Sequence, residues 1–409
     1  MKFVLSACIL LLTCLHCRAD DWPQWRGPNR DCQVAKTEWP DSLDEEHLKS
    51  TWNVSLGPGY SGPIVVGDHV IVTETRNQSH EVVRALNRKT GDEIWKNEWQ
   101  GAMSVPFFAR ANGSWIRSTP ASDGNYVFVM GMRDVLVCLD VASGKEVWRI
   151  DFVRKFEGAL PSFGAVCSPL LDGDSLYVQA AASVVKINKA NGMVEWRTGQ
   201  EDGGALGRGM SSSAFSSPII ATLSGKRQLV VQARTRLLGL DLKTGQQLWS
   251  RPIPAMRGMN ILTPLVYNDT LFTSSYGGGT FCLKVGSAAE VQQLWKTTKQ
   301  AYMSSPVLIA DHAYVHLRNQ RFTCIDVKTG NEKWTTTPFG KYWSMVVNGD
   351  CILALDQLGK LRLVKATPEK YIELDSRKIS GKPTWAHLAI ADGQLFIRGM
   401  DEVRAWRWD

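Results

Sequence analysis

The sequence predicts an all-β protein, an eight-bladed β-propeller of four-stranded antiparallel blades. Three observations support this prediction: a motif ending in Trp recurs along the chain, most units open with a small residue and Pro, and helical signals are almost absent. The units start roughly 40 to 57 residues apart, a span that suits a four-stranded blade. We therefore expect one closed ring over residues 48–409.

The recurring motif is clearest at residues 138–148, CLDVASGKEVW. Alternating apolar residues such as Val135 and Val137 predict a strand with one buried face. Asp140 can accept hydrogen bonds from the turn that follows, and Gly144 supplies its positive φ. Trp148 is expected to fill a slot between neighbouring blades. The other copies end at Trp95, Trp196, Trp249, Trp334 and, more loosely, Trp295.

The start of six units is marked by a small residue and Pro, followed by two strands joined by a short polar turn. These openings are Gly62-Pro63, Thr119-Pro120, Ser168-Pro169, Ser217-Pro218, Thr263-Pro264 and Ser305-Pro306. Two further units, at 343–355 and 385–397, lack the Pro and keep the pattern, which makes eight.

The ring is expected to close through the N-terminal part of the chain. The last unit is one outer strand short, and residues 49–56, KSTWNVSL, have strand composition without a preceding strand to pair with. If this segment completes the last blade, Trp52 occupies the repeat Trp position and no edge strand stays free.

The first residues predict export. A basic start, an apolar run and small residues at Cys17 and Ala19 indicate a cleavable signal peptide over 1–19, followed by an N-terminal arm at 20–47. We expect a periplasmic or secreted monomer; a lipid anchor at Cys8 is the less favoured alternative. Without Lys2 and Arg18, 45 basic and 40 acidic residues remain, a net charge of about +5 that does not indicate nucleic-acid binding.

The cysteines do not predict a disulfide framework. Three of the six that remain after cleavage occupy equivalent repeat positions, which lie far apart in a ring, so we expect small buried side chains. Without a CxxC pair or a His-rich cluster, no zinc site is expected. The six are Cys32, Cys138, Cys167, Cys282, Cys324 and Cys351.

The frame Asp/Asn-x-x-Thr/Ser/Asn-Gly-x-x-x-Trp resembles the pyrroloquinoline-quinone-type (PQQ-like) propeller repeat and covers about 60–409. The arm DWPQWRGPNRD, followed by LGPGYSGP at 56–63, resembles secreted propellers of planctomycete-type bacteria that are often labelled BamB-like. Those relatives usually have Gly where this chain has Cys32.

The resemblance implies two kinds of function. BamB-like propellers imply a binding or assembly scaffold with a protein partner in the cell envelope, which is our first expectation. Quinoprotein alcohol dehydrogenases imply PQQ held by a disulfide of adjacent cysteines and a calcium ion bound by Glu, Asn and Asp. This chain has no Cys-Cys pair, and Asp134 and Asp356 fit hairpin turns, so we expect no cofactor. A carbohydrate-binding or carbohydrate-processing propeller is a further alternative.

Candidate binding residues gather at the mouth, the end of the ring where loops enter the innermost strands. These loops carry Tyr60, Trp115, Arg117, Arg257, Asn260, Tyr302, Lys341, Trp343, Trp385 and His387. Inner hairpin turns add Arg133, Arg236, Arg318, Arg321 and Arg398. Such a set can bind a planar or sugar-like anion or an acidic partner surface. Alternatively, the aromatic rings only fill the channel and the cations are solvated.

Two connections exceed ordinary blade-to-blade loops, at 100–117 and 199–216. Long loops on a rigid ring are common partner-binding sites. We expect the first, with Phe107 and Phe108, to dock a protein or cover the mouth.

For the N-terminal arm, packing of Trp22 and Trp25 on the body of the propeller is favoured over a ligand site.

Overall fold

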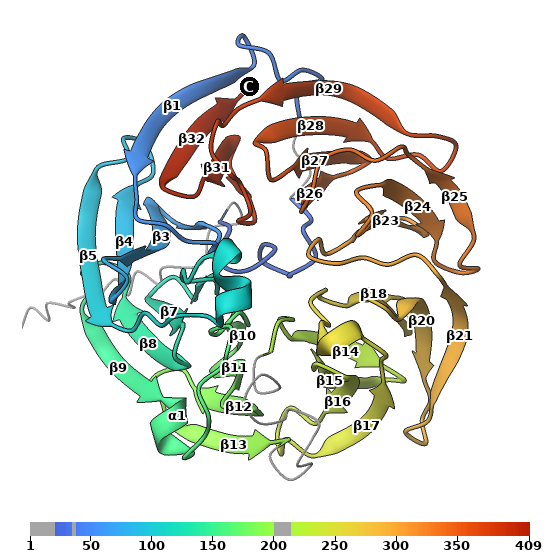
Figure 1. Cartoon of the computed structure of the whole chain (residues 1–409), viewed down its shortest axis with the longest axis horizontal. Coiled ribbons are helices and arrows are strands. Elements are labelled where there is room, and N and C mark those ends of the chain that lie inside the picture. Colours follow the sequence, from blue (N-terminus) through green and yellow to red (C-terminus); the bar gives the residue numbers. More distant parts are fainter. Residues whose placement is uncertain (1–20, 35–37, 200–213) are drawn as a thin grey trace, which may run out of the picture.

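Eight four-stranded antiparallel sheets form a closed ring, as predicted (Figure 1). The computed structural model describes residues 21–34, 38–199 and 214–409. The predicted signal peptide at 1–19 and most of the connection at 199–216 lie outside these ranges. Within the described residues one short α-helix, α1 (Phe152–Lys155), and the 3-10 helices η1 (Phe107–Asn112) and η3 (Met256–Gly258) interrupt the strands.

The first four blades follow one another along the chain, each running from the innermost strand to the outermost. Blade 1 contains β2 (Ile64–Val66), β3 (His69–Arg76), β4 (His80–Asn87) and β5 (Glu93–Gln100). Blade 2 contains β6 (Ala121–Ser122), β7 (Tyr126–Gly131), β8 (Val135–Asp140) and β9 (Glu146–Asp151). Blade 3 contains β10 (Leu170–Asp172), β11 (Ser175–Ala180), β12 (Ser183–Asn188) and β13 (Val194–Thr198). Blade 4 contains β14 (Ile219–Leu223), β15 (Lys226–Gln232), β16 (Arg236–Leu240) and β17 (Gln247–Pro252).

The remaining blades keep this order until the last. Blade 5 contains β18 (Leu265–Tyr267), β19 (Thr270–Ser275), β20 (Gly279–Val285) and β21 (Val291–Thr297). Blade 6 contains β22 (Val307–Ile309), β23 (His312–His316), β24 (Phe322–Asp326) and β25 (Glu332–Thr335). Blade 7 contains β26 (Ser344–Asn348), β27 (Cys351–Leu355), β28 (Lys360–Lys365) and β29 (Ile372–Lys378). Blade 8 contains β30 (Ala389–Ala391), β31 (Gln394–Arg398), β32 (Glu402–Trp408) and β1 (Leu48–Ser55).

The repeat Trp joins six of the eight blades to the next. The ring of Trp95 lies on Gly144 of blade 2, where an added Cβ would lie 2.4 Å from the indole, and its Nε1 donates to Val141 O at 2.7 Å. Gly144 has φ 67°, so the turn and the indole both require glycine there. Trp249 departs from this pattern, because its Nε1 donates to Gln228 within its own blade. Indoles that donate to the following blade are those of Trp52, Trp95, Trp148, Trp196, Trp295 and Trp334.

The ring closes through β1, as the sequence predicts. β1 pairs antiparallel with β32 and places Trp52 opposite Ala405, just as Trp95 lies opposite Ala85 in blade 1. The indole of Trp52 donates from Nε1 to Arg88 O of blade 1 at 3.0 Å. The N-terminal strand therefore supplies both the missing outer strand and the missing contact between the last blade and the first (Figure 1).

The small residues that open the units link the innermost strands. A backbone N–H of one opening donates to the hydroxyl oxygen of the next, at 3.0–3.1 Å. These pairs are Gly62 with Thr119, Thr119 with Ser168, Ser168 with Ser217, and Thr263 with Ser305. The recurrence of Ser and Thr before Pro is thus explained by contact between neighbouring blades.

Residues 21–34, here called the axial segment, lie within the ring. They cross the centre of the ring (Figure 1). Trp22 exchanges backbone hydrogen bonds with Val65 of β2, and Val34 N donates to Val347 O of β26. The Arg26 guanidinium donates to Pro306 O, and that of Arg30 donates to Ser168 O and Pro169 O. The arm was predicted to pack on the body, and its position is the channel itself.

The axial segment enters the channel from the face opposite the mouth. Asp21 accepts a hydrogen bond from Gly67 N in the β2–β3 turn, and this turn lies at the end of the blade opposite its entry loop. Cys32, where the resembling propellers usually have Gly, has φ 67°. This is the left-handed region that glycine favours, so Cys32 adopts a backbone conformation that is strained for a residue with a side chain.

The cysteines behave as small core residues. In the described part of the chain all six are free thiols, and all but the half-buried Cys351 are buried. Cys138, Cys282 and Cys324 lie opposite Trp148, Trp295 and Trp334 in the outer strand of their own blade. The equivalence of the three positions is confirmed.

Two buried carboxyl groups connect successive blades. Glu81 of β4 accepts hydrogen bonds from Met132 N of blade 2 and from the Trp99 indole, and Asp134 accepts one from Ala181 N of blade 3. Burial raises the pKa of each carboxyl to about 7. Both groups are therefore protonated in the folded ring at pH values where the unfolded chain is ionised.

The Glu81→Gln variant is expected to have a flatter pH profile of stability. Because the folded-state pKa of Glu81 lies above its unfolded value, its contribution is complete below about pH 4.5 and is lost as pH rises through about 7. From pH 5 to 8 the free energy of unfolding should fall by roughly 2–3 kcal/mol more in the wild type than in the variant. Burial of His316 and His387 lowers their pKa to about 4 and acts in the opposite direction, but both proteins share it. Parallel profiles from urea titrations would contradict the expectation.

Candidate functional site

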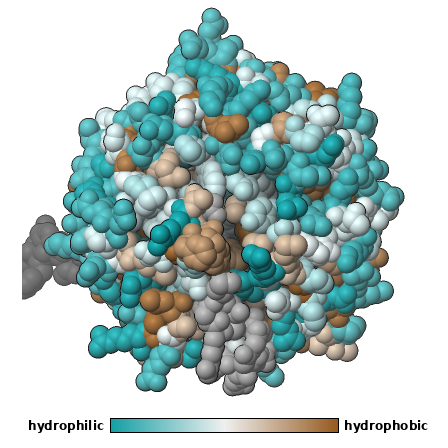
Figure 2. All heavy atoms as spheres, viewed as in Figure 1, coloured by the Kyte–Doolittle hydropathy of each residue, from teal (hydrophilic) through white to brown (hydrophobic). Residues whose placement is uncertain are grey.

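A pocket occupies the axis of the ring at the mouth. It has a volume of about 380 Å³, within the range of small-molecule sites. Entry loops from most of the blades supply its walls, so the site exists only once the ring is closed. Figure 2 shows hydrophobic atoms beside a hollow at the centre of this face. The lining residues are Trp25, Tyr60, Phe108, Ala109, Arg117, Phe163, Val166, Ser168, Phe215, Ser217, Arg234, Arg257, Met259, Ile261, Thr263, Tyr302, Met303, Ser305, Trp385 and His387.

Three guanidinium groups line this axial pocket, and no carboxylate does among the described residues. Arg117 lies over the Tyr60 ring at 5.3 Å and donates to Gly113 O at 2.7 Å. Arg234 lies over Phe215 at 4.8 Å and donates to the carbonyl of Arg257. Burial lowers the pKa of Arg117 and of Arg234, yet a guanidinium stays protonated at neutral pH. The pocket is therefore positively charged.

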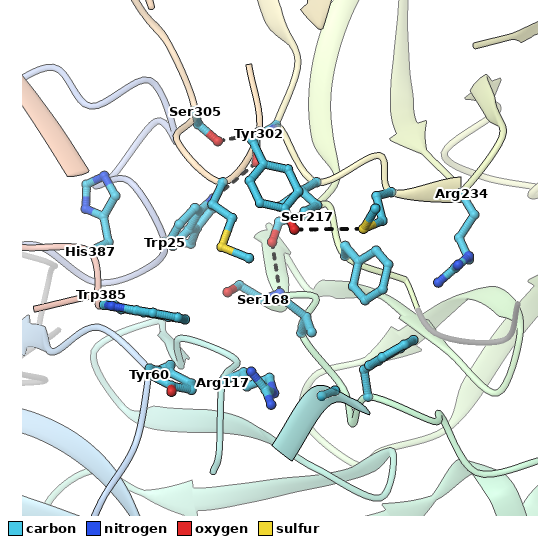
Figure 3. A pocket seen from close by; sticks show the side chains of 18 of the residues that line it. Trp25, Tyr60, Arg117, Ser168, Ser217, Arg234, Tyr302, Ser305, Trp385 and His387 are labelled. Carbon is cyan, nitrogen blue, oxygen red and sulfur yellow. Dashed lines mark hydrogen bonds between the residues drawn. The ribbon is translucent and has the colours of Figure 1, made fainter. Parts of the chain in front are cut away.

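Aromatic rings form the rest of the wall in two groups. Tyr60 stacks on Trp385 with ring centroids 5.0 Å apart and an interplanar angle of 18°. Phe163 contacts both Phe108 and Phe215, at 6.2 and 5.7 Å. Figure 3 shows Arg117 beside the first group and Arg234 on the far side of the pocket. Both aromatic groups thus flank a guanidinium.

The axial segment closes the pocket from behind. Trp25 lines the pocket, donates from Nε1 to Thr263 Oγ1 at 3.3 Å and meets His387 edge to face at 5.0 Å. The His387 ring is buried, with Nδ1 2.8 Å from Leu388 O and Nε2 3.5 Å from Cys32 Sγ. Burial lowers its pKa to about 4, so at neutral pH His387 is an uncharged part of the wall.

Six of the ten predicted mouth residues line the axial pocket, namely Tyr60, Arg117, Arg257, Tyr302, Trp385 and His387. Lys341 lines a neighbouring cavity with Tyr302 and Arg318. Trp343 is buried and stacks on His316 at 4.8 Å. Asn260 is also buried, and its amide donates to the carbonyl of Arg234. Trp115 is half-buried and packs against Gly113.

Two of the five hairpin-turn arginines, Arg398 and Arg318, lie in different surroundings. Arg398, predicted as a mouth cation, is fully buried and donates to the backbone carbonyls of Gly57, Gly59 and Thr73. It holds the chain between blades 8 and 1 and does not face a ligand. Arg318 lies over Tyr276 at 4.3 Å beside the neighbouring cavity.

The long connection at 100–117 lies over the mouth. Its 3-10 helix η1 is near the centre of the ring (Figure 1), and Phe108 lines the axial pocket. Phe107 does not line it, is 79% exposed and meets Phe108 edge to face at 5.7 Å. This loop therefore presents one ring to the pocket and another to the solvent.

Sequence reasoning missed several lining residues. Arg234 lies two residues before Arg236, which was selected in its place, and only the geometry of the β15–β16 turn distinguishes the two side chains. Trp25 was assigned to the arm, whose course through the channel no local pattern indicates. Phe163 and Phe215 lie in irregular connections without a periodic signal.

The described residues do not fit a quinone–calcium pair. The pocket offers no carboxylate as a calcium ligand. No group of three His, Cys, Asp or Glu residues that could hold a metal occurs in the described ranges. Asp134 and Asp356 lie in hairpin turns, where Asp134 accepts a hydrogen bond from Ala181 N and Asp356 pairs with Arg362 at 2.7 Å.

Among the helices in the described ranges, none is long and apolar enough to cross a membrane.

Comparison with protein families gives a match to a family model. Residues 79–336 match the family model described as outer membrane protein assembly factor BamB. Among curated proteins, the assembly factor BamB of Salmonella typhimurium is 23% identical over 387 residues, which cover 86% of each chain.

Solved structures show the same fold at low identity. BamB from Moraxella catarrhalis superposes with a TM-score of 0.64 at 14% identity, covering 88% of this chain and 98% of that one. A quinohemoprotein alcohol dehydrogenase from Pseudomonas putida superposes with a TM-score of 0.65 at 11% identity, covering 95% and 80%. At such identities the likeness concerns the fold alone.

Proposed function

This chain belongs to the family of the outer membrane protein assembly factor BamB, and from that premise we propose that it is an exported binding scaffold for a protein partner in the cell envelope. The partner we propose is a component that assembles outer-membrane proteins, as the family's name indicates. Fold and family support this choice over an oxidoreductase, since the described pocket residues do not fit the quinone–calcium pair.

The observation that carries the proposal is the exposed aromatic loop at the mouth. Phe107 is 79% exposed and Phe108 54% exposed, although large apolar side chains are costly to leave in water. Adjacent exposed aromatic residues on a rigid support are typical of protein-binding sites. The loop rises beside a positively charged pocket, so a partner with an apolar and acidic surface fits this face.

The Phe107→Ser variant is expected to lose partner capture. Because aromatic anchors commonly dominate an interface, we expect the amount of partner recovered from native envelope extract to fall at least tenfold. The measurement is a pull-down in which an outer-membrane protein assembly component is identified by mass spectrometry.

A matched control is the Met193→Ser variant. Met193 is 64% exposed and lies in the β12–β13 turn, at the end of the blade opposite the mouth. It should capture as much partner as the wild type. Absence of any assembly component from the wild-type pull-down would contradict the proposal. An equal loss of recovered partner in both variants would show that the loop is not the binding site.

A further inference from the structure

Two of the three guanidinium groups of the axial pocket have no acidic partner in the described part of the chain. Within the described part of the chain neither Arg117 nor Arg257 forms an ion pair. The Nε–H of Arg117 is buried and has no hydrogen-bond partner among the described residues. Its Nη2 is held by Gly113 O and its plane lies over Tyr60. The side chain is thus fixed, and Nη1, which is not buried and has no hydrogen-bond partner among the described residues, is the donor available to an anion.

The walls beside these donors fit a flat apolar group. The Tyr60–Trp385 stack stands next to Arg117 (Figure 3). The Phe215 ring, which contacts Phe163, lies beneath the Arg234 guanidinium. A planar ring placed between such faces gains stacking contacts as well as burial. Met259 and Met303 provide adaptable apolar surface at the remaining side.

The size and depth of the pocket limit the ligand. A cavity of about 380 Å³ holds a single ring system with a short substituent. Trp25 and His387 close it from behind, so the ligand enters from the mouth. A largely apolar site that is closed at its inner end favours a singly charged group, since a doubly charged phosphate loses more hydration free energy on entry.

We propose that the axial pocket binds an aromatic carboxylate, with the carboxylate on Arg117 and the ring between the aromatic walls. Two sources carry this chemistry: a free aromatic acid and the C-terminal residue of a polypeptide. The inference concerns the pocket alone and does not require the envelope partner proposed above.

The test is calorimetric titration of the full chain with N-acetyl-tryptophan. N-acetyl-tryptophanamide lacks the charge and N-acetylglycine lacks the ring, so each should bind at least tenfold more weakly. Phenyl phosphate should also bind more weakly than the aromatic carboxylate. Equal affinity for the acid and its amide, or no binding of the acid at millimolar concentration, would overturn the proposal.

Two variants test the assignment of the carboxylate. Arg117→Met should weaken N-acetyl-tryptophan binding roughly tenfold, the effect of losing a charge-assisted hydrogen bond. Arg318→Met is the matched control, because Arg318 also lies over a Tyr ring on the same face but outside the pocket. It should bind within twofold of the wild type, and an equal loss in both would overturn the assignment.

A second variant, at the exposed Arg257, keeps the binding test valid if Arg117→Met is destabilised. If Arg117→Met unfolds at a lower denaturant concentration than the wild type, Arg257→Met replaces it, since the side chain of Arg257 is exposed and makes no described hydrogen bond. Because the Arg257 charge adds to the positive potential of the pocket, this variant should bind N-acetyl-tryptophan severalfold more weakly and its amide equally well. Equal losses for the acid and the amide, or an unchanged affinity for the acid, contradict the binding of an anion in this pocket.

A final comparison distinguishes the two sources of the ligand. A peptide ending in Gly-Gly-Trp is compared with its C-terminally amidated form. Tighter binding of the free-acid peptide than of N-acetyl-tryptophan assigns a polypeptide terminus, and weaker binding assigns a small acid. Phe107 lies outside the pocket, so loss of partner capture in Phe107→Ser with unchanged titration separates this inference from the proposed function.

Discussion

Replacing Trp52 by alanine is expected to lower the free energy of unfolding by roughly 3–5 kcal/mol, the range for removing a large buried aromatic side chain. Trp52 is 8% exposed, packs on Gly91 of blade 1 and donates to Arg88 O. It lies on the one strand that joins the N-terminal part of the chain to the last blade. Its loss should therefore weaken ring closure as well as local packing.

Chemical denaturation followed by tryptophan fluorescence measures the effect of Trp52→Ala. The control is Val147→Ala, an exposed position on the outer strand β9, which should change stability by less than about 1 kcal/mol. Hydrogen exchange should show faster exchange in β1 and β32 than in blades 3 and 4. Equal stability losses in the two variants would refute the closure argument.

Replacing Trp22 by alanine is the second large effect, also roughly 3–5 kcal/mol. Trp22 is 3% exposed, its indole covers Gly27 and stacks with His387 at 6.4 Å, and its backbone pairs with Val65. The axial segment holds several blades from inside the channel, so losing this anchor should loosen the segment as a whole.

Limited proteolysis together with denaturation tests the Trp22 prediction. We expect cleavage within residues 21–34 to be faster in Trp22→Ala than in the wild type. Trp39→Ala is the control, because Trp39 belongs to the same N-terminal arm, is only partly buried and packs on Trp408 outside the channel. If Trp39→Ala is as destabilising and as easily cleaved, the position in the channel does not account for the effect.

The architecture could be predicted because the blades repeat the same local structure of strand, turn and strand. Asp140, Gly144 and Trp148 determine a turn and the contact that follows it, and copies of such residues must form the same structure. The same reasoning placed Trp52 on the closing strand, since the last unit lacked one strand. Turn-forming residues, and the alternation of buried and exposed positions along a strand, can be recognised from a sequence.

The candidate site was only partly predictable. Tyr60, Arg117, Tyr302 and Trp385 were found because the topology places every entry loop at the mouth. The burial of Asn260, Trp343 and Arg398 was not foreseen, because it depends on how irregular loops pack on one another.

The sequence by itself determined the number of blades, the register of the repeat Trp and the way the ring closes. Only the tertiary structure decided that residues 21–34 occupy the channel and that Trp25 closes the axial pocket beneath Arg117 and Arg234. The physical reason is the range of the interactions. Repeat contacts join residues about one unit apart, whereas the axial segment binds carbonyls 138 to 280 residues away through buried guanidinium groups, and no local pattern encodes such pairs.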